Sequence, residues 1–188
     1  MEFRNLTAGE IECRVQSIRR DGKGLTLLLY KNARCDMNIL DEAVGAANWQ
    51  REHYECKGNL FCRVGINVNT LPDDNNPVWV WKADCGTESN TEAQKGEASD
   101  SFKRACVNWG IGRELYTAPN IWIPNTKCEI KDTGRKDKNG NPIFVCYDRF
   151  IVEAIKIENK TITGLAIIND SLKAEKQTDK RVLVWKKD

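Results

Sequence analysis

Two clusters of basic side chains have the residue types and spacing to bind a polyanion. Lys103 and Arg104 are adjacent in a stretch with helical periodicity, and both lie opposite its apolar residues. The second cluster lies at a predicted hairpin tip and consists of Lys131, Arg135, Lys136 and Lys138. Lysine and arginine can neutralise phosphates, although a solvated basic edge is the simpler interpretation of each cluster. The charge pattern alone leaves both interpretations open.

Enzyme chemistry finds less support in the residues present. The sequence has no G-x-x-x-x-G-K-[ST] loop and no G-x-G-x-x-G motif for nucleotide phosphates. His53 is the only histidine, and its place in a strand pattern favours a surface or core residue over a catalytic base. Carboxylates are plentiful, so a magnesium-dependent nuclease stays an alternative, but no compact acidic group stands out. We therefore expect no catalytic residues, no cofactor and no bound metal.

The composition is typical of one soluble, cytoplasmic domain. The 188 residues are 40% hydrophobic, enough for one core, and the net charge of +2 means that a polyanion site must come from local clustering. Residues 1–15 lack the apolar run of a signal peptide, and no later stretch is long enough to span a membrane. The eight cysteines are therefore interpreted as reduced thiols, and their spacing does not suit zinc.

The hydrophobic pattern predicts the elements that must position these side chains. A capping-box pattern at Thr7 and Glu10 predicts a short opening helix that reaches Val15. The next segments are predicted as a strand at 25–30, a helix at 36–47, two strands within 49–69 that turn at Gly58-Asn59, a strand at 78–85 and a helix at 97–109. The last helix has the clearest pattern, because its apolar residues recur at i, i+3, i+4 and i+7.

The rest of the sequence predicts further strands. Strand patterns occur at 121–123, 128–131, 143–157 and 161–168, with a turn at 138–141 between two of them. Residues 171–188 are interpreted as a polar, loosely held tail. The order of elements predicts an α+β fold, in which a long central helix packs with a mainly antiparallel sheet of hairpin and meander strands.

The segment Glu97–Ala105, which reads E-A-S-D-S-F-K-R-A and is followed by Trp109-Gly110, resembles the signature helix of the Rad52 family of single-strand annealing proteins, including phage members of the Sak type. Upstream features resemble the family in the same order: the segment Ile11–Val15 with its arginine, Tyr30, a helix that closes with Gly45 and Trp49, and a strand that runs to Gly86. The resemblance covers Leu6 to Tyr116. The remaining third does not resemble the eukaryotic members.

The resemblance implies a basic groove that holds the phosphates of single-stranded DNA. Its lining would include Arg14, Lys103 and Arg104. The eukaryotic family has a further arginine three residues after the Lys-Arg pair, where this sequence has Val107. One phosphate contact would therefore be missing, or it would be made instead by Arg113, Lys95 or Lys82. The cluster at 131–138 could be a second contact for duplex or for the incoming strand.

The function implied by the resemblance is ATP-independent binding of single-stranded DNA and annealing of complementary strands in recombination and repair, by a homo-oligomeric ring or filament. Partners would be the complementary strand and a phage exonuclease or host single-strand coating protein. The protein would be phage-encoded and located in the bacterial cytoplasm. A general protein that coats single strands without speeding their pairing is, with the nuclease, the alternative.

The resemblance also suggests how the chain is organised. Residues 1–120 would form the annealing core, 121–170 additional strands packed on the same domain, and 171–188 the tail. Trp79 and Trp81 lie on one side of a predicted strand, where they could stack on bases. Tryptophans in such positions more often anchor a core or a subunit interface.

Overall fold

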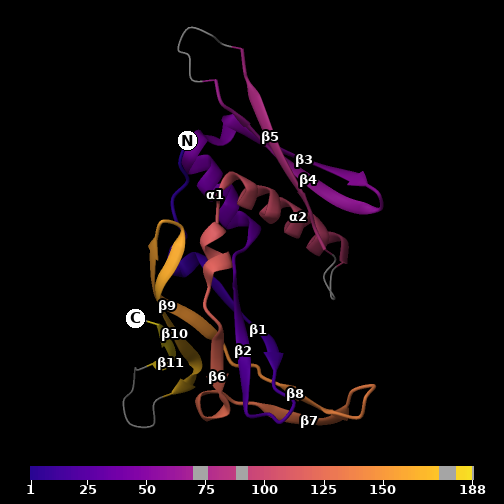
Figure 1. The fold of residues 1–188 in the computed structure, drawn as a ribbon, viewed down its shortest axis with the longest axis vertical. Helices are drawn as coiled ribbons and strands as arrows, with labels where there is room; N and C mark the ends of the chain where they lie inside the picture. Colours follow the sequence, from indigo (N-terminus) through magenta and orange to yellow (C-terminus); the bar gives the residue numbers. More distant parts are fainter. Residues whose placement is uncertain (70–75, 88–92, 174–180, 188) are drawn as a thin grey trace. The chain divides into compact units, whose positions relative to one another are not determined.

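The computed structural model of the protein describes residues 1–69, 76–87, 93–173 and 181–187. The chain forms two compact units, and each combines segments that are distant in the sequence. The first unit contains residues 1–5 and 32–113, and the second contains residues 6–31 and 114–188. Each unit has a sheet of its own (Figure 1).

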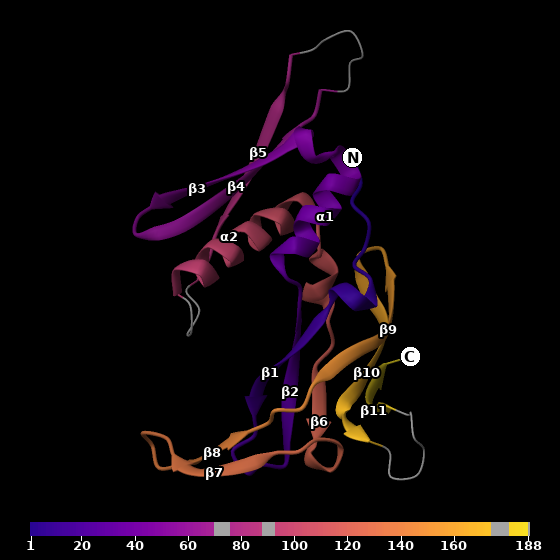
Figure 2. The ribbon, with the colours of Figure 1, turned by 180° about the vertical axis from the view of Figure 1, so that it is seen from behind.

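The first unit is a three-stranded sheet with two helices. Its elements in chain order are α1 (Ala33–Val44), the 3-10 turn η2 (Ala46–Asn48), β3 (Trp49–Cys56), β4 (Asn59–Asn67), β5 (Trp79–Cys85) and α2 (Ala93–Trp109). The strands are antiparallel in the order β3-β4-β5. Helix α2 packs on β4 and β5, and α1 packs against α2 (Figures 1 and 2). This order confirms the predicted meander of three strands after the first helix.

Buried apolar residues at every second position of β4 determine which face of this sheet α2 covers. Cys62, Val64 and Ile66 are fully buried, as are Phe102 and Cys106 of α2. Because successive strand residues point to opposite faces, the residues between them face away from the helix. The buried side of α2 is therefore fixed by apolar packing, and its polar side is left for other contacts.

The second unit is a six-stranded sheet with a separate hairpin. The sheet strands are β1 (Glu12–Ile18), β2 (Gly24–Tyr30), β6 (Ile121–Pro124), β9 (Phe150–Glu158), β10 (Thr161–Lys173) and β11 (Arg181–Lys187). They pair in the order β11-β10-β9-β1-β2-β6, and each pairing is antiparallel. The hairpin consists of β7 (Lys131–Lys136) and β8 (Pro142–Val145), and short 3-10 turns lie at η1 (Ala8–Glu10), η3 (Arg113–Thr117) and η4 (Asn125–Lys127).

Buried leucines at every second position of β2 form part of the core of the second unit. Leu25 and Leu27 are buried and pair in register with Ile123 and Ile121 of β6, which are buried as well. Leu28, on the opposite face, is exposed. The period of two in this apolar segment therefore gives one buried and one open face of the sheet.

The structure confirms the predicted α+β class and most elements of the first 116 residues. The strands predicted at 25–30 and 78–85 and the helix at 97–109 are present, with starts shifted by one to four residues. Helix α1 begins before the predicted start because the side chain of Asn32 accepts hydrogen bonds from the backbone N–H groups of Arg34 and Cys35. The β3–β4 turn lies at Lys57-Gly58, one residue earlier than predicted, and both residues have positive φ.

The predicted opening helix is wrong. The Glu10 carboxylate does accept a hydrogen bond from the backbone N–H of Thr7 at 2.8 Å, as a capping box requires, but only the turn η1 follows. From Glu12 the chain pairs with β2 instead. A local capping signal was therefore overridden by strand pairing with a neighbouring segment.

Two strand predictions in the last third need correction, although the turn at 138–141 is confirmed. The strand predicted at 128–131 is absent, and β7 starts at Lys131. The strand predicted at 143–157 is divided into β8, which pairs with β7, and β9, which belongs to the six-stranded sheet; residues 146–149 between them, including Asp148, are in no strand. One oxygen of that carboxylate accepts from the backbone N–H of Glu129 and from the side chain of the buried Asn169, each at 2.8 Å.

The predicted tail at 171–188 includes the end of β10 and the edge strand β11. Residues 174–180 and 188 lie outside the described residues. In β11 the side chain of Val184 is buried, and its strand pairs with β10. The second unit joins segments from either side of the predicted boundary at 120, and the three predicted domains stay a prediction. No helix in the described ranges is long and apolar enough to cross a membrane.

Candidate nucleic-acid interface

Helix α2 carries the adjacent cations Lys103 and Arg104 on its half-buried, polar side, next to the buried Phe102 and Ala105. Arg104 donates a hydrogen bond from Nε to Oδ2 of Asp100, one turn earlier, at 2.9 Å. The two side chains of this pair are 42% and 28% exposed. An exposed i,i+4 ion pair is worth only about 0.3–0.5 kcal/mol, so a phosphate could compete for the guanidinium.

Lys82 and Arg113 meet at the C-terminal end of α2. Lys82 donates from Nζ to the carbonyl oxygen of Asn108 at 2.9 Å and lies 4.4 Å from the ring centre of Trp109. Arg113 donates from Nη2 to the same carbonyl at 3.0 Å and from Nε to that of Val107 at 2.9 Å. The last carbonyls of a helix need such donors, and cations there are favoured by the helix dipole. Both residues therefore have a structural role in ending α2.

Lys95 lies in the first turn of α2 and is exposed. Eight residues of helix separate it from Lys103, which corresponds to roughly 12 Å along the axis. The first unit thus brings five of the six predicted groove residues onto or against one helix: Lys82, Lys95, Lys103, Arg104 and Arg113.

The sixth predicted residue, Arg14, belongs to the second unit. It is exposed on β1, and its guanidinium carbon lies 4.8 Å from the ring centre of Tyr30 on β2. Burial, followed by the nearby Glu12 carboxylate, raises the pKa of Tyr30, while Arg14 acts in the opposite direction. The predicted groove requires Arg14 to lie beside the cations of α2, which belong to the other unit. The groove as a whole therefore stays a prediction.

The second basic cluster is exposed throughout. Lys131, Arg135 and Lys136 lie in β7, and Lys138 lies in the turn to β8. Lys131 forms an exposed ion pair with Glu129 at 3.2 Å. Asp137, inside the cluster, accepts hydrogen bonds from Asn141, which hold the pKa of its carboxyl below the usual value. The predicted hairpin at this cluster is therefore present.

The face of the first unit's sheet that points away from α2 carries aromatic side chains. Lys82 reaches the end of α2, so its neighbour Trp81 points to the opposite face. Trp79 and Trp81 have ring centres 6.2 Å apart, and the Arg63 guanidinium lies 4.5 Å from the ring centre of Trp81. Whether these rings stack on bases or form a subunit interface stays a prediction.

Two described features bear on the catalytic alternatives, the place of His53 and the grouping of possible metal ligands. His53 is exposed, and its Nε2 lies 3.1 Å from the carbonyl oxygen of Ala98, so it is a surface residue that links β3 to α2. Within the described ranges, no group of three or more His, Cys, Asp or Glu side chains could hold a metal ion.

Comparison with known protein families gives a match that includes α2. Residues 9–132 match the model of the Rad52/22 family of double-strand break repair proteins, which is more than half of the chain. The protein belongs to the Rad52 family. The match includes β1 with Arg14 and all of α2, and it ends at the start of β7. The resemblance of the sequence to this family is thereby confirmed.

A similar curated protein is the single-stranded DNA-binding protein DdrA of Deinococcus radiodurans. It is 30% identical over 126 residues, which cover 62% of this chain and 57% of the relative. The matched part thus spans a little over half of that protein's length. A comparison with solved structures gave no significant match.

Sequence reasoning missed one group of cations in the second unit. Arg19 and Arg20 follow the end of β1 at Ile18, and Lys23 lies in the same turn, just before β2. The doublet beside Asp21-Gly22 was a visible signal in the sequence, but nothing local relates it to the cluster at 131–138, more than a hundred residues later.

Proposed function

We propose that this Rad52-family protein binds single-stranded DNA and anneals complementary strands without ATP, in recombination and repair. The observation that carries the proposal is helix α2, whose family signature places Phe102 and Cys106 in the core and Lys103 and Arg104 on the polar side. Family membership and the single-stranded DNA binding named for the relative from Deinococcus radiodurans support the choice of ligand.

The chemistry of these cations suits annealing. Contacts to phosphate supply affinity that does not depend on base sequence, and they leave base edges open to a second strand. Lys103, Arg104 and Arg14 would make these contacts, with Lys95 extending the track along α2. Base pairing itself supplies the driving force, so the protein needs neither a nucleotide nor a catalytic group.

Lys82 and Arg113 contribute differently in this proposal. Both donate to carbonyls at the end of α2, so they hold the helix that presents Lys103 and Arg104. Their positive charge adds to the potential that attracts DNA, even where they do not touch a phosphate.

The proposal includes an oligomer larger than a dimer, in a ring or filament, because one subunit can hold only a short part of a strand. We propose further that residues 1–120 form the annealing core and that residues 121–170 add strands to it. The protein would be phage-encoded and cytoplasmic, and it would act with an exonuclease or a host coating protein. Light scattering on the protein alone and on a long oligonucleotide tests the oligomer, and a monomer in both conditions contradicts it.

The annealing of two complementary oligonucleotides carrying a fluorophore and a quencher tests the central function. We expect the protein to speed quenching equally with ATP, without ATP and with EDTA, and to leave both strands intact. A strict requirement for nucleotide contradicts the proposal. Cleavage that EDTA abolishes indicates the nuclease, and binding without faster pairing indicates the general coating protein.

A further inference from the structure

Two cysteines, Cys128 and Cys146, lie next to each other at the base of the hairpin that β7 and β8 form. Cys128 follows the turn η4, and Cys146 follows the last residue of β8. Both are free thiols, and their side chains are hydrogen-bonded to each other. Sγ of Cys128 also lies 3.5 Å from the carbonyl oxygen of Pro124, to which it can donate. Neither cysteine belongs to the candidate nucleic-acid interface.

The two segments that carry these thiols are held together by other side chains. Asn169 is fully buried and donates from Nδ2 to the carbonyl oxygen of Lys127 at 3.2 Å and to Oδ2 of Asp148 at 2.8 Å. The same carboxylate oxygen accepts from the backbone N–H of Glu129 at 2.8 Å. Each thiol therefore has a neighbour within two residues that is fixed to the opposite segment. The contact between the sulfurs is built into the second unit.

The two thiols differ in exposure and in how well their thiolates are stabilised. Cys128 is 6% exposed, whereas Cys146 is half-buried. Burial raises the pKa of Cys128 to about 12, and the charges of Cys146 and Asp148 act in the same direction. Burial also raises the pKa of Cys146, with smaller contributions from the Asp148 and Glu129 carboxylates. Two hydrogen bonds oppose this rise, from the backbone N–H of Asp148 and from the Cys128 thiol.

These differences assign an order of reaction. The thiolate is the form of cysteine that attacks an oxidant, and the attacked molecule must reach it from solvent. Cys146 meets both conditions better than Cys128 does. Cys128 is placed to attack the sulfur of Cys146 in a second step, because the hydrogen bond between them already brings the two sulfurs into contact.

We propose that Cys128 and Cys146 form a reversible disulfide when a hydroperoxide oxidises the protein. In the first step the Cys146 sulfur attacks one oxygen of the hydroperoxide, the O–O bond breaks, and an alcohol leaves with the thiol proton. Cys146 is then a sulfenic acid. In the second step the Cys128 sulfur attacks the Cys146 sulfur, the S–O bond breaks, and hydroxide leaves as water with the Cys128 proton. A small thiol restores both cysteines by disulfide exchange.

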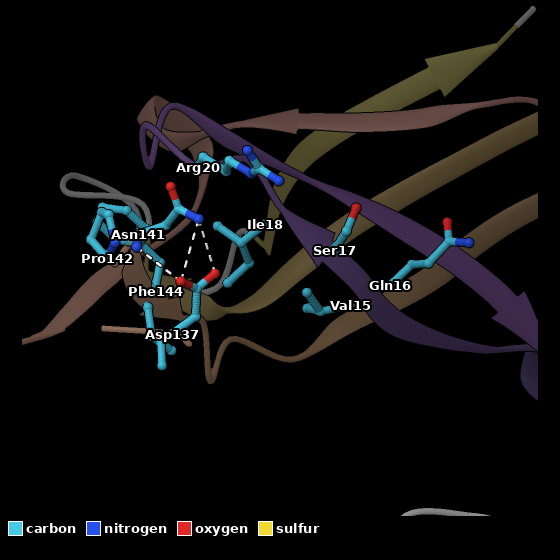
Figure 3. Close-up of a pocket in the computed structure, with 10 residues that line it drawn as sticks. Val15, Gln16, Ser17, Ile18, Arg20, Asp137, Asn141, Pro142 and Phe144 are labelled. Carbon is cyan, nitrogen blue, oxygen red and sulfur yellow. Dashed lines mark hydrogen bonds between the residues drawn. The ribbon is translucent and has the colours of Figure 1, made fainter. Parts of the chain in front are cut away.

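The disulfide closes residues 129–145, which include the whole hairpin, into a covalent loop. The hairpin lines one side of a pocket of about 350 Å³ whose other side is lined by β1 (Figure 3). At the tip of the hairpin, the hydrogen bonds from Asn141 to Asp137 hold the turn, and Figure 3 shows both residues beside Ile18 and Arg20. Oxidation therefore ties this wall of the pocket to η4. The modification involves no DNA contact and does not depend on the proposed function.

Peptide mapping of the full protein tests the bond. The dilute protein is treated with tert-butyl hydroperoxide, the remaining thiols are blocked with iodoacetamide, and the digest is analysed by mass spectrometry without reduction. We expect a pair of peptides joined through Cys128 and Cys146 that separates after dithiothreitol. The control Cys56→Ser removes an exposed thiol outside the pair and should give the same joined peptides. Alkylation of both Cys128 and Cys146 after the treatment overturns the proposal, and this result needs no variant.

Two variants test the order of the steps. In Cys128→Ser the sulfenic acid on Cys146 has no partner thiol, so dimedone should trap it, whereas the parent should be trapped far less. In Cys146→Ser the buried Cys128 should stay a thiol. Circular dichroism verifies that both variants are folded. Equal trapping on Cys128 in Cys146→Ser and on Cys146 in Cys128→Ser overturns the assigned order.

Thermal unfolding measures the consequence for the fold. The oxidised parent should have a Tm about 5–10 °C above that of the reduced parent, because closing a loop of this size restricts the unfolded chain. Cys56→Ser should show the same rise, and Cys146→Ser should show none. Joined peptides without any rise in Tm would overturn the conclusion that the bond fits the native hairpin.

Discussion

Replacing Arg104 with alanine removes one cation from the polar side of α2 and leaves the buried side intact. Arg104 is paired with Asp100 at 2.9 Å, and both side chains are partly exposed. Such a pair contributes about 0.3–0.5 kcal/mol, and alanine is the better helix former. The free energy of unfolding should therefore fall by less than about 0.5 kcal/mol, and the Tm by at most about 2 °C.

The replacement should change the salt dependence of DNA binding, although it changes stability little. If Arg104 contacts a phosphate, its loss should flatten the slope of log affinity against log salt by about 0.7 for a single strand. Raising the salt concentration from about 50 to about 200 mM weakens binding by both proteins. The factor by which affinity falls should be about 2.6 times smaller for the variant than for the parent. The effect should not depend on base sequence, because a phosphate contact carries no base information.

Fluorescence anisotropy with labelled oligo-dT at several salt concentrations measures this slope, and thermal unfolding monitors the fold. Lys156→Ala is the matched control, since Lys156 is also an exposed cation paired with a carboxylate, Glu158 at 2.8 Å, but lies on β9 in the second unit. The reasoning is refuted if the folded Arg104 variant keeps the parental slope, or if the control flattens it as much.

Three further predictions concern stability and reactivity. Lys82→Met, which removes the donor to the end of α2 and the cation over a tryptophan ring, should lower the free energy of unfolding by about 1–2 kcal/mol in urea; no change would contradict its capping role. Gly65→Ala should cost about 1–3 kcal/mol, because the added Cβ would lie 2.8 Å from the Trp81 ring; a neutral result would refute that packing. Burial raises the pKa of Cys13 to about 12, so at pH 8 iodoacetamide should label the exposed Cys56 well before it, and mass spectrometry showing equal rates would contradict this.

Elements with strong local periodicity could be predicted from the sequence. Helix α2 has apolar residues at i, i+3, i+4 and i+7 from Phe102 to Trp109, and β2 is a short apolar run bounded by turn residues. The candidate site could be predicted from the same segment, because Lys103 and Arg104 lie where the helical period places them. The family resemblance then suggested the ligand that we propose.

Features that depend on contacts between distant segments could not be predicted. The opening residues become β1 because β2 is available to pair with them, against their own capping signal. Asp148 divides a strand because it binds Glu129 and Asn169, which are 19 and 21 residues away. The capping role of Lys82 needs Asn108, 26 residues later. None of these partners can be recognised from local periodicity.

The measurement that tests the central claim most directly is the annealing rate of the double variant Lys103→Glu/Arg104→Glu against Lys156→Glu/Lys186→Glu, which reverses two exposed charges elsewhere. Complementary labelled oligonucleotides are mixed with each protein without ATP, and circular dichroism verifies that both variants are folded. We expect the α2 variant to lose most single-strand binding and to anneal no faster than DNA alone, while the control variant anneals like the parent. Annealing at the parental rate by the folded α2 variant would contradict the account.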